Sequence, residues 1–323
     1  MMRIRFAGLV GFLILVVLVG SATEFALQGS ATQRPQREVA ITFDDLPALG
    51  PLTQMRSITE RLLKTITANQ IPAIGFVNEG KLHLAGEEEA RTALLQMWID
   101  AGLELGNHTY SHINMDQVSL AAYQEDVIRG EPVTRRLMEQ KGMKLRYFRH
   151  PMLHTGPSLQ YKKSLDAFLA NRGYTIAPVT LGNNDFMFAL VYDEAKKRGD
   201  AADAKRISNA YVPYMEAVIE FFEKLSVQTL GYEVKQTLLL HANEINADHF
   251  GDLAQMMKRR GYKFISLQNA LSDKAYSLPE APSKTGLSWI HRWRLAKNLE
   301  MKPEPSEPAF ISSAFREALQ RQR

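Results

Sequence analysis

The sequence contains no cysteine among its 323 residues. That absence excludes thiolate metal ligands, cysteine nucleophiles and disulfide bonds together. A strong excess of either charge is also missing: the formal net charge is +4, and residues 276–323, with eight Lys/Arg against five Asp/Glu, account for three of these charges. Because the rest of the chain is close to neutral, the composition argues against a nucleic-acid-binding groove. No internal repeat is found at the periods typical of solenoid proteins.

The remaining composition is that of a folded protein, with 45% hydrophobic and 23% charged residues. This balance excludes a chain that is disordered throughout. A chain of this length can bury a large core, and one domain of roughly 230 to 250 residues with appendages is the expected organisation.

The first residues have the pattern of an export signal. A short basic start precedes an uninterrupted run of fifteen apolar residues and glycines from Phe6 to Gly20. A run of this length suits the core of a signal peptide and is short for a membrane-spanning helix. No further charge appears before Glu24, so an uncleaved membrane anchor over residues 1–23 is the alternative. Both interpretations predict an exported protein that meets a membrane only through this segment, with residues 24–36 as a linker.

From residue 37 onward, short apolar segments alternate with amphipathic segments. Strands are expected at residues 38–43, 71–77, 103–105, 145–148, 174–179, 237–240 and 263–267. Helices are expected between them at residues 55–69, 87–101, 120–140, 159–171 and 247–260, with Pro132 starting a second helical segment or kinking the first. Three helix-to-strand junctions carry a glycine where a helix needs a left-handed closing residue, at Gly102, Gly173 and Gly261. This alternation of strands and helices, with glycines at the junctions, predicts a parallel α/β sheet or barrel.

The alternation breaks between about residues 186 and 235, where helical patterns at residues 188–198 and 204–225 follow each other without a strand. We interpret this part as a helical insertion packed beside the barrel. The predicted domain therefore spans residues 37–272, and residues 273–323 form a C-terminal extension.

Titratable side chains follow five of the predicted strands, directly or within a short loop. They are Asp44 and Asp45, His108, Arg149, Asp185 and His241. In parallel α/β sheets and barrels the carboxyl ends of the strands meet at one edge, where active sites are built. The sequence therefore predicts that these side chains lie close together.

Three of the predicted neighbours form a metal-binding set. His108 and His112 are four residues apart, close to one helical turn, so their imidazoles are expected on the same side of the backbone. With Asp45 as third ligand, the set offers one oxygen and two nitrogens and leaves a position open for water, as in catalytic zinc sites. The same donors bind iron, cobalt or nickel, so the sequence favours zinc and leaves these metals open.

The other titratable residues have roles that follow from this assembly. Asp44, next to the metal ligand, would act as general base on a water molecule, and His241 would protonate the leaving group. A charged hydrogen bond from Arg149 would orient Asp44, and Asp185 would pair with His241 and keep it cationic.

Five segments in this order resemble the motifs of the NodB-type polysaccharide deacetylases, which form carbohydrate esterase family 4. They are Thr-Phe-Asp-Asp at 42–45, His-Thr-Tyr-Ser-His at 108–112, Phe-Arg-His-Pro at 148–151, Asn-Asp-Phe at 184–186 and Leu-Leu-Leu-His at 238–241. The resemblance covers about residues 37–272. It implies a distorted (β/α) barrel and a reaction that removes N- or O-linked acetyl groups from sugars, usually with zinc.

This sequence departs from the family pattern at several positions around the expected substrate groove. His150 stands where a second proline is common, the segment from Pro151 to Gly156 is two residues longer and contains His154, and Phe186 replaces the usual tryptophan. We take His150, Pro151, His154 and Phe186 as candidates for substrate contact, and a packing role for the two histidines stays open.

The predicted function is that of a metal-dependent deacetylase of an N- or O-acetylated glycan, such as peptidoglycan or chitin-type oligomers. Two alternatives remain. The same machinery could act on a non-sugar amide, a cyclic imide or an ester, or the chain could bind glycans without catalysis. The sequence does not predict an oligomeric state.

Overall fold

The computed structural model describes residues 36–321, so the predicted export signal and nearly all of the predicted linker lie outside the described residues. Within the described part of the chain, none of the helices combines the length and the apolar character needed to cross a membrane.

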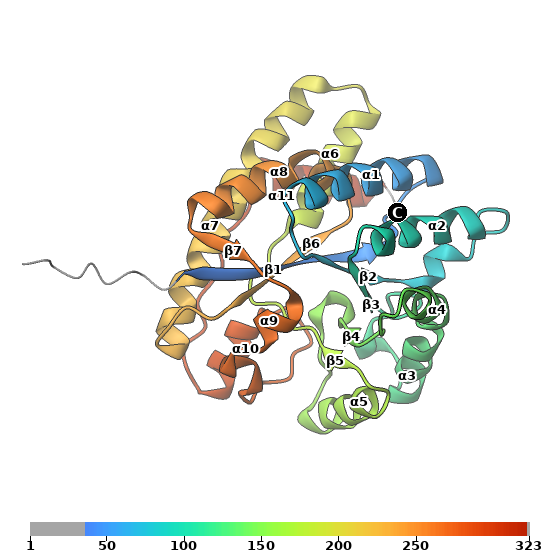
Figure 1. Ribbon diagram of the computed structural model, residues 1–323. Helices are drawn as coiled ribbons and strands as arrows, with labels where there is room; N and C mark the ends of the chain where they lie inside the picture. Colours follow the sequence, from blue (N-terminus) through green and yellow to red (C-terminus); the bar gives the residue numbers. More distant parts are fainter. Residues whose placement is uncertain (1–35, 322–323) are drawn as a thin grey trace, which may run out of the picture. The chain divides into compact units, whose positions relative to one another are not determined.

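One parallel sheet organises the described chain (Figure 1). Its strands are β1 (Arg37–Leu46), β2 (Ile74–Val77), β3 (Glu104–Asn107), β4 (Tyr147–Phe148), β5 (Thr175–Ile176), β6 (Gln236–His241) and β7 (Tyr262–Phe264). They follow the order β5-β4-β3-β2-β1-β6, and β7 pairs with the first three residues of β1. Because β1 is covered on both faces, most of its residues are buried, and this explains why Thr42 is the one polar residue between Val39 and Phe43.

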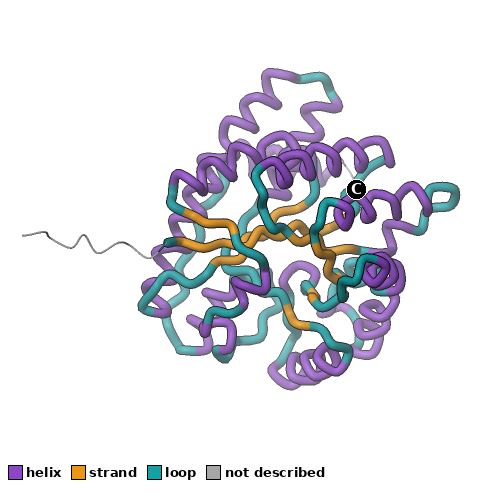
Figure 2. The backbone as a smooth tube through the Cα atoms, in the orientation of Figure 1, coloured by secondary structure: helices purple, strands orange, loops and turns teal. Residues whose placement is uncertain are grey.

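The sheet curls until its two ends meet. Beyond β5 the chain runs beside β6, where the backbone N–H groups of Thr180 and Leu181 donate to the carbonyl of Thr237 at 3.1 and 3.0 Å. A parallel bridge joins Leu181 to Leu238. The architecture is therefore the predicted distorted (β/α) barrel, and Figure 2 shows the helices arranged outside the strands.

The connecting helices lie close to their predicted positions. They are α1 (Leu52–Ala68), α2 (Glu88–Asp100), α3 (Leu120–Arg129), α4 (Pro132–Gln140), α5 (Leu159–Asn171) and α8 (Glu244–Arg259). Pro132 starts a second helix, α4, which decides between the two possibilities left by the sequence. Gly102, Gly173 and Gly261 have φ values of 77°, 80° and 85°, as expected of left-handed residues that close α2, α5 and α8.

The main core lies between β1 and the helices around it. The ring of Phe43 makes edge-on contacts with Trp98 of α2 and Phe250 of α8, at centroid distances of 5.7 and 5.2 Å. All three side chains are almost completely buried. Full burial of one such side chain contributes about 1.5–3 kcal/mol, so these contacts hold β1, which carries the candidate active-site aspartates, firmly between two helices.

The predicted insertion consists of α6 (Asp185–Lys197) and α7 (Ala201–Leu230), with no strand between them. The two helices pack against each other and against α8. The 30 residues of α7 make it about 45 Å long. The insertion begins at Asp185, so its first helix starts at the candidate site.

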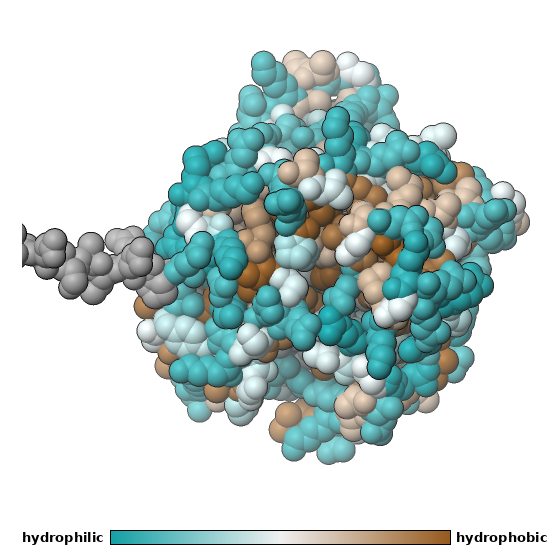
Figure 3. Space-filling model, viewed as in Figure 1, coloured by the Kyte–Doolittle hydropathy of each residue, from teal (hydrophilic) through white to brown (hydrophobic). Residues whose placement is uncertain are grey.

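The C-terminal segment after residue 272 also packs on this body. It contains α10 (Trp289–Ala296) and α11 (Ala309–Arg321), and it follows the short helix α9 (Leu267–Leu271). Trp289 and Trp293 belong to the same buried cluster as the β1 side chains. Helix α11 packs on α6, and α10 packs on α7. Hydrophilic side chains predominate on the outer helices in the view of Figure 3.

Candidate active site

Strand register brings the predicted residues to one edge of the barrel. Asp44 of β1 pairs with His241 of β6, and Asn107 of β3 pairs with Phe148 of β4. His108 and Arg149, which follow Asn107 and Phe148, therefore emerge side by side. The backbone confirms this arrangement, because the N–H of Arg149 donates to the carbonyl of Asn107 at 2.9 Å.

Asp45, His108 and His112 form a three-residue cluster of potential metal ligands. The Oδ1 atom of Asp45 lies 4.0 Å from Nε2 of His108 and 3.8 Å from Nε2 of His112. All three ligand atoms lie within 4.8 Å of one another. In a tetrahedral site with bonds of about 2.1 Å, ligand atoms are about 3.4 Å apart. The separations between these atoms would therefore shorten by about 0.4 to 1.4 Å on binding one divalent ion.

The protonation states of these residues also fit a metal. The Nδ1–H of His108 donates to the carbonyl of Arg149 at 2.9 Å, and since a carbonyl only accepts, Nε2 is left with its lone pair. Burial, together with the charge of His112, lowers the pKa of His108 well below its ordinary value. Burial also lowers the pKa of His112. Both imidazoles are therefore neutral near pH 7, as metal ligands must be.

The carboxylate of Asp45 is ready for a cation as well. Its Oδ1 atom is buried without a hydrogen bond among the described residues, and Nζ of Lys81 lies 3.4 Å from it. Burial works against ionisation, but Lys81 and the surrounding histidines lower the pKa of Asp45. An ionised oxygen that lacks a hydrogen bond is costly unless a positive charge approaches it. The donor set and the clustering of its three ligand atoms together fit a divalent metal.

The segment that carries the two histidines is not helical, and this corrects the sequence-based argument. Residues 108–112 form a loop after β3, in which Thr109 and His112 are left-handed, with φ values of 64° and 55°. The side chain of Asn107 accepts a hydrogen bond from the N–H of Thr109 at 2.7 Å and stabilises the first turn. The two imidazoles meet because the loop bends back on itself. The spacing of four residues does not reflect a helical turn.

A carboxylate from α3 holds the same loop. Asp126 accepts hydrogen bonds from the N–H of Ser111 at 3.0 Å and from its hydroxyl at 2.9 Å, and the backbone carbonyl of Asp126 accepts from the N–H of Tyr110. Sequence reasoning missed Asp126. Its place in α3, beyond the histidine motif, contains no local signal of a contact with residue 111.

Arg149 lies beside Asp44 without the charged hydrogen bond that the sequence suggested. Its Nη1 atom is 3.7 Å from Oδ2 of Asp44, the separation of an ion pair, and its Nη2 atom donates to the hydroxyl of Thr42 at 2.9 Å. The guanidinium also lies over the ring of Phe76, 4.7 Å from its centroid. Burial raises the pKa of Asp44 to about 6, in opposition to Arg149 and His241.

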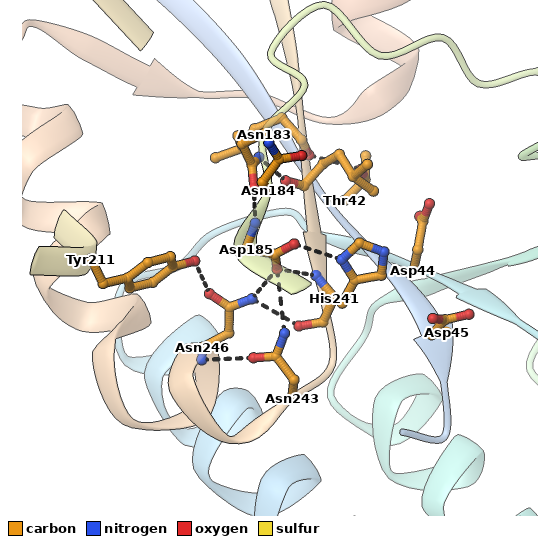
Figure 4. A network of polar contacts seen from close by, with 12 residues as sticks. Thr42, Asp44, Asp45, Asn183, Asn184, Asp185, Tyr211, His241, Asn243 and Asn246 are labelled. Carbon is orange, nitrogen blue, oxygen red and sulfur yellow. Dashed lines mark hydrogen bonds and ion pairs between the residues drawn. The ribbon is translucent and has the colours of Figure 1, made fainter. Parts of the chain in front are cut away.

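His241 and Asp185 make the predicted pair. The Nδ1 atom of His241 lies 2.7 Å from Oδ1 of Asp185, and the backbone N–H of His241 donates to Oδ2 at 2.9 Å. The side chain of Asn246 donates to Oδ2 at 2.7 Å and is itself held by Tyr211. Figure 4 shows His241 between Asp185 on one side and the two aspartates of β1 on the other. Asn246 and Tyr211 were not predicted.

The environment of His241 favours its protonated form. Burial by itself would lower the pKa of His241, but the charge and hydrogen bond of Asp185, with further contributions from Asp45 and Asp44, raise it to about 9. The imidazolium form is therefore favoured at neutral pH. Asp44 and His241 thus combine a base of raised pKa with an acid that stays charged, which is the pairing that general acid–base chemistry needs.

These groups face a cavity of about 550 Å³. Its lining consists of Asp44, Asp45, His108, His112, Met152, Leu153, His154, Asn183, Asn184, Phe186, Leu239, His241 and Gly286. A second cavity of about 340 Å³ shares Asp45, Phe186 and His241 with the first and continues along α1, α6 and the start of α8. The space suits a small ligand or a segment of a longer one.

Two of the four predicted substrate-contact residues line a cavity, and the other two do not. His154 and Phe186 line the larger cavity, and Phe186 is 44% exposed with its ring edge-on to His241. His150 and Pro151 line neither cavity. His150 is 1% exposed and packs against the ring of Phe148, so the structure places it behind the cavity wall, where burial keeps it from a ligand.

Part of the chain matches a known protein family. Residues 31–176 match the polysaccharide deacetylase family. This range contains the three candidate metal ligands, Asp44 and Arg149, whereas Asp185 and His241 lie beyond it.

Two curated relatives are deacetylases. A peptidoglycan-N-acetylglucosamine deacetylase from Bacillus cereus is 30% identical over 100 residues, which cover 31% of this chain and 32% of the relative. The match thus spans about a third of that protein's length. A chitin deacetylase from Colletotrichum lindemuthianum is 24% identical over 273 residues, which cover 79% of this chain and 95% of the relative.

Solved structures are more distant. A family 4 acetyl xylan esterase from Clostridium thermocellum, in complex with a cobalt ion, has a TM-score of 0.49 at 18% identity, over 75% of this chain and 93% of the other. A family 4 pseudoenzyme from Bacillus anthracis has a TM-score of 0.46 at 15% identity, over 73% of this chain and 66% of the other.

Proposed function

We propose that this chain, whose residues 31–176 match the polysaccharide deacetylase family, is a metal-dependent hydrolase that removes acetyl groups from an N- or O-acetylated glycan. The observation that carries the proposal is the assembly around one cavity of Asp45, His108, His112, Asp44 and His241, with the buried Asp185 paired to His241. A glycan-binding protein has no chemical use for a general base and a charged acid beside a metal site.

A divalent metal held by Asp45, His108 and His112 would polarise the acetyl carbonyl group and lower the pKa of a water molecule. Zinc is the proposed metal because two imidazoles and one carboxylate are the donors of many catalytic zinc sites. Cobalt, nickel and iron accept the same donors.

The protein's own groups move the protons in this proposal. Asp44, with a pKa raised to about 6, takes a proton from the water that attacks the acetyl carbon. His241, charged at neutral pH, gives its proton to the departing nitrogen or oxygen of the sugar. Asp185 stabilises the imidazolium and fixes the ring, and Arg149 limits the rise in the pKa of Asp44. Proton transfers of this kind typically contribute about 10² to 10⁴ in rate.

The proposed setting is outside the cytoplasm. It rests on the export pattern of residues 1–23, and comparison of the N-terminus of the exported protein with the gene sequence tests it. A chain that keeps residue 1 on the exported protein favours the anchor over the signal peptide.

The deciding experiment is acetate release from a panel of acetylated oligosaccharides, namely chitin-type oligomers, peptidoglycan fragments and acetylated xylo-oligosaccharides. The purified protein is assayed as isolated, after treatment with a chelator, and after addition of zinc or cobalt. We expect acetate from at least one substrate, loss of activity with the chelator and recovery with metal. Metal-independent release, or none from any glycan, would reject the proposal.

A second candidate function is hydrolysis of a non-sugar amide, imide or ester. The second cavity beside His241 favours it, because much of its lining is apolar and includes Leu49, Ile58, Ala189 and Leu190. Such a wall suits an acyl chain or an aromatic group better than sugar hydroxyls. A panel of small amides and esters, assayed beside the glycans, separates the two functions, since turnover of the small substrates alone supports this one.

A further inference from the structure

The C-terminal segment lies against a loop of the candidate active site. The N–H of Thr155 donates to the carbonyl of Ser283 at 2.9 Å, and the N–H of Ser283 donates to the hydroxyl of Thr155 at 3.0 Å. Gly286 lines the larger cavity itself. Its backbone is so close that an added Cβ would lie 3.0 Å from the carbonyl oxygen of Met152. A segment outside the expected domain therefore forms part of the cavity wall.

The loop that this segment touches has an unfavourable backbone. Met152 and Leu153 are consecutive left-handed residues, with φ values of 55° and 56°. Residues with a Cβ rarely adopt this conformation, and two in succession persist only where surrounding contacts impose it. The side chains of both residues line the larger cavity.

Arg292 of α10 supplies such contacts. Its guanidinium donates to the backbone carbonyl of Leu153 and to the hydroxyl of Thr155, and it stacks over the ring of Trp289 at 4.4 Å. The residue is completely buried, and no carboxylate of residues 36–321 forms an ion pair with it. Burial of a charge is costly unless its donors are used, and here two of them hold the strained loop.

The next residue of the loop is His154. Its Nδ1 atom lies 2.6 Å from Oδ2 of Asp116, and the imidazole lines the larger cavity. Asp116 thereby fixes the ring and leaves Nε2 for a ligand, as Asp185 does for His241. An imidazole fixed in this way forms a directed hydrogen bond with a sugar hydroxyl, and the neighbouring Met152 and Leu153 offer apolar contact to a ring face.

We propose that Ser283, Gly286 and Arg292 complete the substrate site. Arg292 is a positioning residue that holds Met152 and Leu153 in their left-handed conformation, so that His154 meets a hydroxyl group of the glycan. This inference rests on the proposed function for the class of ligand. It assigns to the C-terminal segment a role in glycan binding that a terminus packed on the core for stability alone would not have.

The test compares two buried arginines of the same helix. Arg292→Met removes the contacts with the loop. Arg294→Met is the matched control, because Arg294 is also buried but donates to Thr229 and to the carbonyl of Glu300, away from the cavity. The probe is an N-acetylglucosamine tetrasaccharide, its dissociation constant is measured by calorimetry, and KM and kcat are measured from acetate release. The metal content and melting temperature of each variant are recorded.

We expect Arg292→Met and His154→Gln each to raise the dissociation constant and KM about tenfold, the loss of one good hydrogen bond, with kcat much less affected and metal content unchanged. Arg294→Met leaves both constants within about twofold of the wild type. Because Arg292 acts through His154, the double variant binds about as weakly as His154→Gln alone. Gly286→Ala tests the same loop without removing a charge, and it raises KM at an unchanged melting temperature.

Equal effects of the two arginine substitutions, or additive effects of Arg292→Met and His154→Gln, would overturn the inference and leave the segment a purely structural role. If Arg292→Met does not fold, Gly286→Ala decides, and a wild-type KM for it counts against the proposal. If the wild-type protein binds the tetrasaccharide but releases acetate from no glycan of the panel, the proposed function alone is rejected, since binding still tests the loop. Absence of binding rejects the inference.

Discussion

The Nδ1 atom of His241 lies 2.7 Å from a carboxylate oxygen of Asp185 that is completely buried. Burial alone would raise the pKa of Asp185, but His241 and the N–H donors around the carboxylate lower it. The same contact raises the pKa of His241. The two residues therefore stabilise each other in their charged forms, and the acid of the proposed reaction depends on this pair.

The pH dependence of the reaction should move when this pair is broken. In Asp185→Asn the main cause of the raised pKa is lost, so His241 loses its proton at a lower pH. Because the imidazolium is the reactive acid, activity falls as the pH rises through its pKa. The basic limb of kcat/KM therefore moves to lower pH, and activity at neutral pH falls about 10²-fold or more. The measurement is kcat/KM between pH 5 and pH 10.

The control is Asp252→Asn, which removes the partner of another histidine, His249, at an exposed site on α8. It should leave the pH profile as in the wild type. An unchanged basic limb in Asp185→Asn would mean that His241 is not the acid.

Metal binding should depend on the three clustered residues. Asp45→Ala and His112→Ala each remove one of three ligands, and with two left the site loses most of its affinity. We expect about one metal ion per wild-type chain by elemental analysis and less than about one tenth of this in either variant. His249→Ala, a substitution of a half-buried histidine outside the cluster, should retain the wild-type content. Equal metal content in all the proteins would place the metal elsewhere.

The base can be separated from the metal ligands by one substitution. Asp44→Asn keeps the size of the side chain but cannot accept the proton, so kcat should fall about 10² to 10⁴, while the metal content stays that of the wild type. Acetate release and elemental analysis on the same preparation give both results. Full activity of the variant would remove Asp44 from the mechanism and revive a glycan-binding role.

Asp126 should matter for metal affinity although it is not a ligand. It holds Ser111 in the loop between the two histidines, and outer contacts of this kind typically contribute about 10- to 100-fold to metal affinity. Asp126→Ala should therefore weaken zinc binding by about that factor in a competition titration against a chelator.

Ser119→Ala is the matched control for this variant, because it removes the N-terminal cap of the same helix, α3, and touches no residue of the histidine loop. It should lower stability by about 1 kcal/mol without affecting the metal. Similar zinc affinities for the two variants would show that only the helix, and not the contact with the loop, is important.

Much of the fold was predictable because it depends on local sequence patterns, such as hydrophobic periodicity and the glycines that end helices. Helix α5 was predicted with the bounds that the structure has, and the glycines at 102, 173 and 261 ended helices as expected. Such features depend on residues a few positions apart. The bounds of the shorter strands were predicted less well. Strands β4 and β5 have two residues each, fewer than predicted, because the apolar sequence continues beyond the paired residues.

The sequence predicted which residues of the site lie at strand ends. It predicted less well how their side chains contact one another. The expected meeting of Asp44 with His241 follows from parallel register. The helical geometry assumed for His108 and His112 was wrong, since left-handed residues held by Asn107 and Asp126 shape that loop. The ion pair between Nη1 of Arg149 and Asp44 at 3.7 Å also replaced the expected hydrogen bond, while Nη2 donates to Thr42.

The sequence by itself determined the alternation of strands and helices along the chain, the titratable residues at the strand ends, and the resemblance to polysaccharide deacetylases. Only the tertiary structure decided that Arg292 bonds to Leu153, 139 residues away, and that Gly286 forms part of the cavity wall. Periodic burial is encoded by near neighbours, whereas a contact between distant segments has no local signal, since it depends on how the whole barrel closes.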